Sequence, residues 1–416
     1  MTLVKSISAM TVSHIIVNAL AFFSIAFFVD HYGPSLYALI AFYIAFQAWL
    51  VTFDLGFTPA LVRNLSPKLS SICYSDKILE IKREAAVYRF FFCMISVAIL
   101  IISGVIFAVT GTFERFAPND WLQIALLLPL IASFRFYTTV EKAFYRASES
   151  FLILASLNIF FAFLRYVTIF FVIGNSKNVI HFFYFQALVS FFELLIYFSL
   201  HQKIPRSSIW VAKNDLVVLT KNLRFILYSG IAGLAWLSII SIDKIFLFGV
   251  IPDANYSGYT ILVQLASLAL LVFAPLTGVL QPRVASLRET LGLDAVSRFV
   301  LRCNQFVVPL LGAILITLYT AFSAVFNIWA NQDLDSGYEV VFLFFLMGYG
   351  LCVQGLVSYL LQFSVSNMKI HGLAHVSVAV IYTPVVAGLA MSGNIFAISV
   401  AWLVAATLIS QVAGFI

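Results

Sequence analysis

The residues of this chain that could do chemistry are charged side chains inside long apolar runs. Asp243 and Lys244 stand together in LSIISIDKIFLFG (237–249), Arg165 stands in FFAFLRYVTIFF, and Glu193 stands in SFFELLIYF. A charge in mid-membrane costs about 2.5–3.5 kcal/mol on insertion scales, so such a residue normally faces water or a partner. Cations in these positions can bind anions, and a carboxylate there can bind and release a cation.

Composition shows what surrounds these charges. The chain has 416 residues, of which 62% are hydrophobic and 10% charged, whereas soluble domains carry about 25% charged residues. About 20 apolar residues cross a bilayer as a helix. We therefore predict an all-α polytopic membrane protein whose opening MTLVKSISAM leads into a retained first span. The apolar runs predict twelve spans, at 7–29, 37–57, 85–110, 122–140, 151–173, 179–200, 223–250, 257–281, 300–325, 338–364, 371–391 and 394–416.

The distribution of Lys and Arg predicts the orientation of these spans, because both residues favour the cytoplasmic side. With the N-terminus inside, two of the 24 basic residues (Arg115 and Lys177) fall in outer loops and two (Arg165 and Lys244) within spans. The other 20 lie in cytoplasmic segments or at cytoplasmic span ends. Both termini are therefore expected in the cytoplasm, and the net charge of +6 indicates topology and not nucleic-acid binding.

An internal repeat predicts two similar halves. The stretches 32–66 and 256–287 each begin with tyrosines, cross as one apolar helix, and meet Gly and Pro near the inner end. Both finish on Arg-x-x-Ser, at Arg63 and at Arg283. The repeat relates span 2 to span 8, which gives two lobes of the same orientation, as in transporters that rock two bundles about a central site. We expect a six-helix lobe over 1–200, a polar cytoplasmic linker over 201–222 and a second six-helix lobe over 223–416.

Several of these stretches resemble a known family. FDLGFTPALVRNLS (53–66), SIISIDKIFL followed by NYSGYTI, and PRVASL (282–287) resemble segments of the O-antigen and polysaccharide-unit flippases. That family shares a superfamily with the MATE multidrug exporters. The resemblance implies a MATE-like fold, alternating access, and transfer of an undecaprenyl-pyrophosphate-linked oligosaccharide across a bacterial inner membrane.

Five cations are the candidates for binding a transported anion. Arg165 and Lys244 are expected at middle to outer depth in their spans, lining a central cavity. Arg165 could instead form a structural ion pair, for instance with Asp243, and Lys244 could reach the outer surface. Arg63, Arg135 and Arg283 lie at inner span ends and could receive a lipid pyrophosphate, or could serve as topology determinants near anionic headgroups.

Three carboxylates near hydrocarbon could couple transport to H⁺ or Na⁺, namely Glu193, Asp54 and Asp243. The alternatives are structural: Asp54 could pair with Arg63, and Glu193 could hydrogen-bond within its lobe. Asp243 and Lys244 are neighbours about 100° apart on a helix, so each is expected to find its own partner.

The chain shows no motif for nucleotide binding or nucleophilic catalysis, and its four scattered cysteines have neither metal-site nor disulfide spacing. We therefore expect no enzyme activity, metal or cofactor. Three functions remain open. A flippase of lipid-linked oligosaccharides is favoured over an ion-coupled multidrug exporter, because cations and not carboxylates stand in the candidate cavity. A membrane glycosyltransferase or polymerase is disfavoured because its catalytic loops are missing from the short outer segments.

Overall fold

The structure is a computed structural model, and it describes residues 3–52, 54, 56–70, 74–111, 114, 119–173, 178–200, 217–247, 259, 262–263, 265–330, 337–365 and 368–414. The chain divides into two compact units, Met1–Leu223 and Arg224–Ile416. Most of the predicted linker (residues 201–216) lies outside the described residues, as do Arg115 and Lys177.

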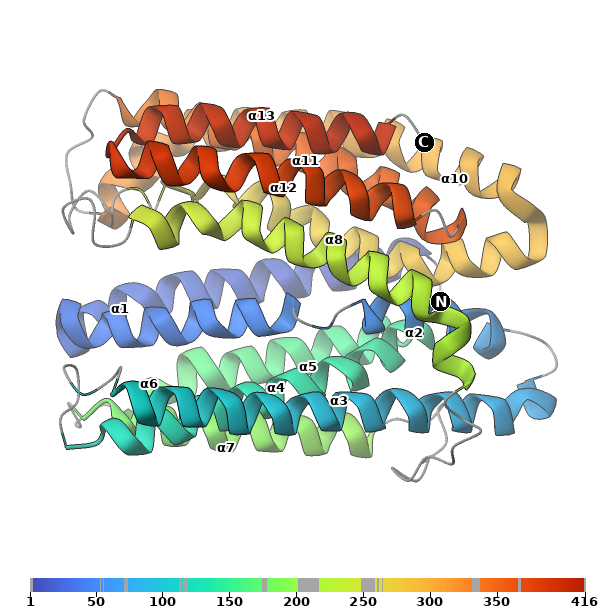
Figure 1. Ribbon diagram of the computed structural model, residues 1–416, viewed down its shortest axis with the longest axis horizontal. Coiled ribbons are helices and arrows are strands. Elements are labelled where there is room, and N and C mark those ends of the chain that lie inside the picture. Colours follow the sequence, from blue (N-terminus) through green and yellow to red (C-terminus); the bar gives the residue numbers. More distant parts are fainter. Residues whose placement is uncertain are drawn as a thin grey trace. The chain divides into compact units, whose positions relative to one another are not determined.

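The first unit is a bundle of long apolar helices (Figure 1). In it α4 packs against both α3 and α7, α1 packs against α5, and the short α2 packs against α3 and α4. The chain from α5 to α6 is one continuous helical rod with a π-helical turn, η1, at its middle. The elements are α1 (Leu3–Thr52), α2 (Phe57–Ser70), α3 (Tyr74–Thr110), α4 (Trp121–Ala147), α5 (Phe151–Phe163), η1 (Leu164–Thr168), α6 (Ile169–Ile173) and α7 (Ile180–Ser199).

The segment α1 contains the first two predicted spans, and it reverses direction between them (Figure 1). The rings of Phe28 and Tyr43 both contact Phe182, with centroid distances of 5.4 and 5.6 Å. In a straight helix these two residues would be about 22 Å apart, too far to share one neighbour. The shared contact therefore requires two antiparallel arms, whose aromatic side chains form part of the buried core of this unit.

The second unit is also helical, with α11 packed against α10 and α13 and with α12 packed against α13. Its long element α10 is two helices joined at a kink at Gly292, where φ is 79°. A positive φ is strained for residues with a side chain, so glycine permits this reversal (Figure 1). The elements are α8 (Val217–Leu247), α10 (Leu268–Ala330), α11 (Tyr338–Val365), α12 (Met368–Met391) and α13 (Ile395–Gly414).

The predicted fold class is confirmed. Within the described residues the chain is helical without strands, and eight helices are long and apolar enough to cross a membrane. Counting α1 and α10 as two crossings each, and α5 to α6 as one, gives six crossings in each unit. The third predicted span, 85–110, is the later part of a longer helix, because α3 runs unbroken from Tyr74 to Thr110.

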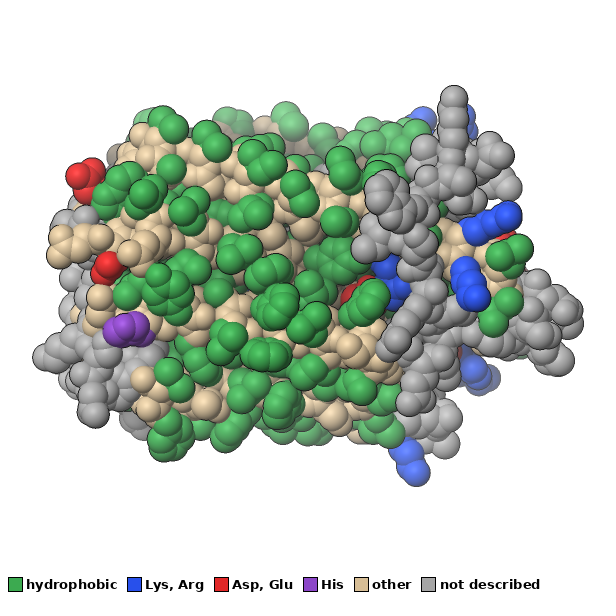
Figure 2. All heavy atoms as spheres, turned by 90° about the horizontal axis from the view of Figure 1, so that it is seen from below, with side chains coloured by type: hydrophobic (Ala, Val, Ile, Leu, Met, Phe, Trp, Pro, Cys, Tyr) green, Lys and Arg blue, Asp and Glu red, His purple; other side chains and the backbone are tan. Residues whose placement is uncertain are grey.

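The surface matches a bilayer environment. Large apolar side chains are exposed along α3, among them Ile101, Val105 and Val109. Figure 2 shows hydrophobic side chains over most of the visible face, with Lys and Arg side chains gathered towards one end. This distribution has the form expected of helices that contact lipid along their length and headgroups at one end.

Candidate functional site

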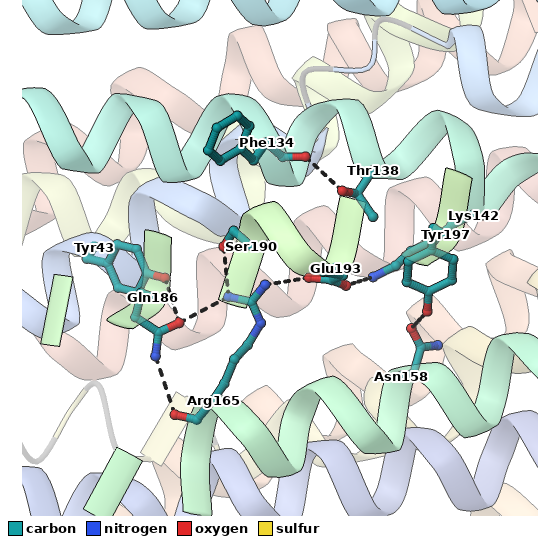
Figure 3. Close-up of polar contacts among 10 residues, drawn as sticks. All are labelled: Tyr43, Phe134, Thr138, Lys142, Asn158, Arg165, Gln186, Ser190, Glu193 and Tyr197. Carbon is teal, nitrogen blue, oxygen red and sulfur yellow. Dashed lines mark hydrogen bonds and ion pairs between the residues drawn. The ribbon is translucent and has the colours of Figure 1, made fainter. Parts of the chain in front are cut away.

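A buried ion cluster lies inside the first unit, and Arg165 is its centre (Figure 3). Arg165 stands in the π-helical turn η1, and π-turns interrupt regular helices often at functional sites. Its guanidinium donates to the Gln186 Oε1 at 3.0 Å and to the Ser190 Oγ at 3.1 Å, and it forms an ion pair with Glu193. Gln186 and Glu193 lie seven residues apart on α7, so both face the same side of that helix.

Glu193 is shared between two cations. Its second carboxylate oxygen, Oε1, lies 2.7 Å from the Lys142 Nζ of α4. Lys142 also lies over the ring of Tyr197, 5.1 Å from its centroid. Two positive charges therefore meet one carboxylate, and the cluster carries a formal excess of one positive charge.

The three charged groups meet near the middle depth of the bundle. The Arg165 backbone is 14 residues from the start of α5, about 21 Å, whereas Glu193 is six residues from the end of α7, about 9 Å. Helical side chains lean towards the N-terminus of their own helix. Arg165 therefore reaches towards the end of the bundle at which α5 begins, while Glu193 and Lys142 reach away from that end. The charge of Arg165 thus lies nearer the middle of the bundle than its backbone does.

Lys142 belongs to a basic stripe on α4 of which sequence reasoning identified only Arg135. Arg135, Lys142 and Arg146 follow one another at spacings of seven and four residues, which places them within about 40° around the helix axis. All three are half-buried. Their spacing is visible in the sequence, where Arg135 is a candidate for binding a lipid pyrophosphate but Lys142 and Arg146 count only as cytoplasmic charges near a span end. We name the set Arg135, Lys142 and Arg146 the α4 basic stripe.

A second buried ion pair in this unit is structural. The Arg89 guanidinium binds Glu141 through two parallel hydrogen bonds, of 2.8 and 3.0 Å, and both side chains are almost completely buried. The rings of Phe144 and Phe198 lie about 5 Å from the same guanidinium. Every charge in this pair is matched and enclosed, so the pair ties α3 to α4 and offers no open position to a ligand.

In the second unit, Asp243 is buried beside Tyr259, whose hydroxyl donates to the Asp243 Oδ2. Its other oxygen, Oδ1, is buried with no hydrogen-bond partner among the described residues. Lys244 donates to the Ile240 carbonyl at 2.6 Å, and its Nζ lies 3.5 Å from that Oδ1. Each residue thus has its own hydrogen-bond partner, as expected. The ion pair between the two was not expected, and it forms because the long Lys244 side chain folds back by one helical turn.

The remaining candidates stand on none of the elements that carry the ion cluster, which are η1, α4 and α7. Asp54 is nevertheless close enough to Arg146 of the α4 basic stripe to interact with its charge. Asp54 accepts from the Gly56 N–H at 3.0 Å in the turn between α1 and α2, which is a structural role at the start of a helix. Arg63 is half-buried on α2, and Arg283 is exposed on α10 in the second unit. The structure thus brings together Arg165 and Glu193 from the predicted set, with Arg135 near enough to interact electrostatically with Glu193, and it adds Lys142 to them.

Comparison with solved structures defines the class of fold. The chain matches a point mutant of the Vibrio cholerae MATE transporter VcmN at 14% identity and TM-score 0.77, over 99% of this chain and 95% of that one. It matches the eukaryotic MATE transporter AtDTX14 at 13% identity and TM-score 0.76, over the same shares. The chain also matches a MOP superfamily transporter from Pyrococcus furiosus at 11% identity and TM-score 0.70, over 99% of this chain and 94% of that one. For that transporter, reverse polarity of the binding pocket suggests a different function.

This chain therefore has the MATE transporter fold, which comprises twelve transmembrane helices in two lobes. No family model matches the chain, and no curated protein matches its sequence.

Proposed function

We propose that this protein is a membrane transporter that works by alternating access of its two lobes. The proposal is supported by the fold, since the solved structures that match 99% of the chain are transporters. Six crossings in each unit suit two bundles that rock about a central site.

The comparisons favour a small-molecule exporter over the flippase that the sequence motifs suggest. One matched structure is the outward-facing conformation of a multidrug resistance MATE family transporter, at 14% identity and TM-score 0.68. A lipid-linked oligosaccharide flippase is the second candidate, and the stretches around Arg63 and Asp243 that resemble such flippases support it.

The chemistry of the ion cluster favours an anionic cargo in either case. The observation that carries this is the excess of positive charge around Arg165, where Lys142 and Arg165 share one carboxylate and Arg135 of the α4 basic stripe lies near the same carboxylate. A buried guanidinium with fixed partners binds carboxylate or phosphate oxygens in a defined geometry. A site for organic cations would need the opposite balance of charge.

A coupling ion, H⁺ or Na⁺, would most readily bind Asp243. Both oxygens of Glu193 are held by cations, and Asp54 caps a turn. Asp243 retains a buried oxygen without a hydrogen-bond partner among the described residues, at 3.5 Å from the Lys244 Nζ, and Tyr349 and Tyr382 are close enough to interact with its charge. We place the protein in a bacterial inner membrane with both termini in the cytoplasm.

A deletion strain separates the two candidate functions. If the protein is a flippase, deletion makes an undecaprenyl-pyrophosphate-linked oligosaccharide accumulate on the inner leaflet. If it exports small molecules, the lipid-linked pool is unchanged and sensitivity to anionic toxic compounds increases. An unchanged strain in both assays, with the protein normally expressed in the parent, would contradict both candidates.

A further inference from the structure

We infer that Glu193 is an internal counter-anion: it holds Lys142 and Arg165 while the protein is empty and gives way to the acidic group of the cargo. The inference rests on the proposed anionic cargo and adds the mechanism by which the site is kept ready.

The first support is the bridging geometry of the carboxylate. One oxygen of Glu193 contacts Lys142 at 2.7 Å and the other contacts the Arg165 guanidinium. A phosphate or carboxylate on a cargo molecule presents oxygens at a similar separation, so it can make the same pair of charge-assisted hydrogen bonds. Glu193 thus satisfies in the empty protein the contacts that an anionic ligand would make.

The second support is that Arg165 does not depend on Glu193 for its position. Gln186 accepts from Arg165 and from the Tyr43 hydroxyl (3.2 Å), and its amide nitrogen donates back to the Arg165 carbonyl at 3.3 Å. The Arg165 Nη1 that donates to Gln186 also donates to the Ser190 hydroxyl. These neutral partners would keep the guanidinium in place after the carboxylate has left, and a preorganised donor loses less entropy on binding.

The third support is access. The Lys142 side chain is 24% exposed, whereas those of Arg165 and Glu193 are each 5% exposed. An incoming anion therefore reaches Lys142 before it reaches Arg165 or Glu193.

The displaced carboxylate also has an alternative partner. Arg135 precedes Lys142 by seven residues in the α4 basic stripe, and it lies near enough to interact electrostatically with Glu193. Arg135 makes no side-chain hydrogen bond within the described part of the chain. A move of Glu193 from Lys142 towards Arg135 would keep its charge paired, which avoids the cost of an isolated buried charge.

The test is anion binding by the purified, detergent-solubilised protein, with inorganic pyrophosphate and geranyl pyrophosphate as probes and isothermal titration calorimetry as the readout. Glu193→Gln removes the competing charge but keeps the side-chain size. We therefore expect the variant to bind both probes at least about tenfold more tightly than wild type, which corresponds to about 1.4 kcal/mol of binding free energy. Lys142→Gln should weaken binding. Glu80→Gln is the matched control, because Glu80 pairs with Lys68 outside this cluster, and it should bind as wild type does.

Glu193→Asp provides a second test if the Gln variant does not fold. Its shorter carboxylate cannot bridge both cations, so the affinity should fall between those of wild type and Glu193→Gln. If wild type binds the probes but the Glu193 variants bind equally or more weakly, the counter-anion inference is wrong while the anionic cargo stands. If no variant and no wild-type protein binds either probe, the proposed anionic cargo fails together with the inference.

Discussion

At the scale of single residues, two ion pairs of one bundle serve different purposes. The Arg89–Glu141 pair is bidentate, nearly fully buried and electrically balanced. The Arg165–Glu193 pair stands in a cluster with a surplus cation and a partly exposed lysine. Balance and enclosure are what a structural pair needs, whereas surplus charge with access is what a binding site needs.

The Arg89–Glu141 pair should therefore control stability and not cargo binding. Breaking a buried pair leaves an uncompensated charge, at a cost of about 3–5 kcal/mol. We expect Glu141→Gln to lower the free energy of unfolding by that amount in a denaturant titration. The double variant Arg89→Met with Glu141→Leu should recover much of the loss, because it buries no unmatched charge. A single variant as stable as wild type would show that the pair is not buried in the folded protein.

Sequence reasoning found single charged residues but not their partners. Arg165 and Glu193 were identified because each interrupts an apolar run. Their pairing depends on how η1 packs against α7. The residues LRYVT contain no pattern that predicts the π-helical turn in which Arg165 stands. Lys142 was not identified as a site residue because it lies near a span end, where lysine is common. The fold of Lys244 back towards Asp243 was missed because helix geometry alone neglects the length of a lysine side chain.

At the scale of elements, α2 is held to the first turns of α3 by a charged contact. Lys68 of α2 pairs with Glu80 at 2.9 Å and with Glu84, both on α3. Partial burial on its own would lower the pKa of Lys68, but the hydrogen bonds and charges of Glu84 and Glu80 outweigh it, and the pKa lies above its usual value.

A raised lysine pKa makes this contact sensitive to alkali. The stabilisation is fully present below the unfolded-state pKa of about 10.4 and is lost as pH rises through the higher folded-state value. Lys68→Gln should therefore lower the melting temperature at about pH 8, and the difference from wild type should shrink above about pH 10.5. A difference that stays constant up to about pH 11.5 would mean that the charge of Lys68 contributes nothing.

Close packing in the second unit gives a prediction about helix contact. A Cβ added at Gly372 of α12 would lie 2.8 Å from the Tyr228 carbonyl oxygen of α8, which is backbone and cannot rotate away. Gly372→Ala should cost about 1–3 kcal/mol of stability, as overpacking does. Gly388→Ala is the control on the same helix, because no described atom lies within 4 Å of its Cβ position. Thermal unfolding of both variants checks this, and equal stability would contradict the close approach.

At the scale of the whole molecule, the span map follows from composition and charge. Apolar runs separated by polar breaks predicted twelve spans, and the helices of the MATE transporter fold bear out this architecture. The boundaries within α1 and α10 were harder to predict, because α1 reverses direction within one continuous helical segment and α10 is interrupted only at Gly292. Hydropathy alone predicts neither the positive φ of Gly292 nor the reversal that brings both arms of α1 against Phe182.

The orientation of the map is a separate prediction, and it rests on the basic residues. Reporter fusions after Ser208 and after Asn331, two positions outside the described residues, should report cytoplasm and periplasm respectively. Alkaline phosphatase and green fluorescent protein give opposite signals on the two sides, so each position has an internal check. The same side at both positions would overturn the twelve-span map.

The central claim is that the excess charge around Arg165 serves an anionic cargo. The most direct measurement is transport by purified protein in proteoliposomes, with a fluorescent prenyl-pyrophosphate lipid and a small fluorescent organic anion as cargoes, and ethidium as the organic cation. We expect wild type to move at least one anion faster than ethidium. Arg165→Ala should abolish that movement at normal reconstitution, and Arg165→Lys should keep part of it, because a lysine supplies the charge without the planar fork. Preferred transport of ethidium, or full anion transport by Arg165→Ala, would contradict the account.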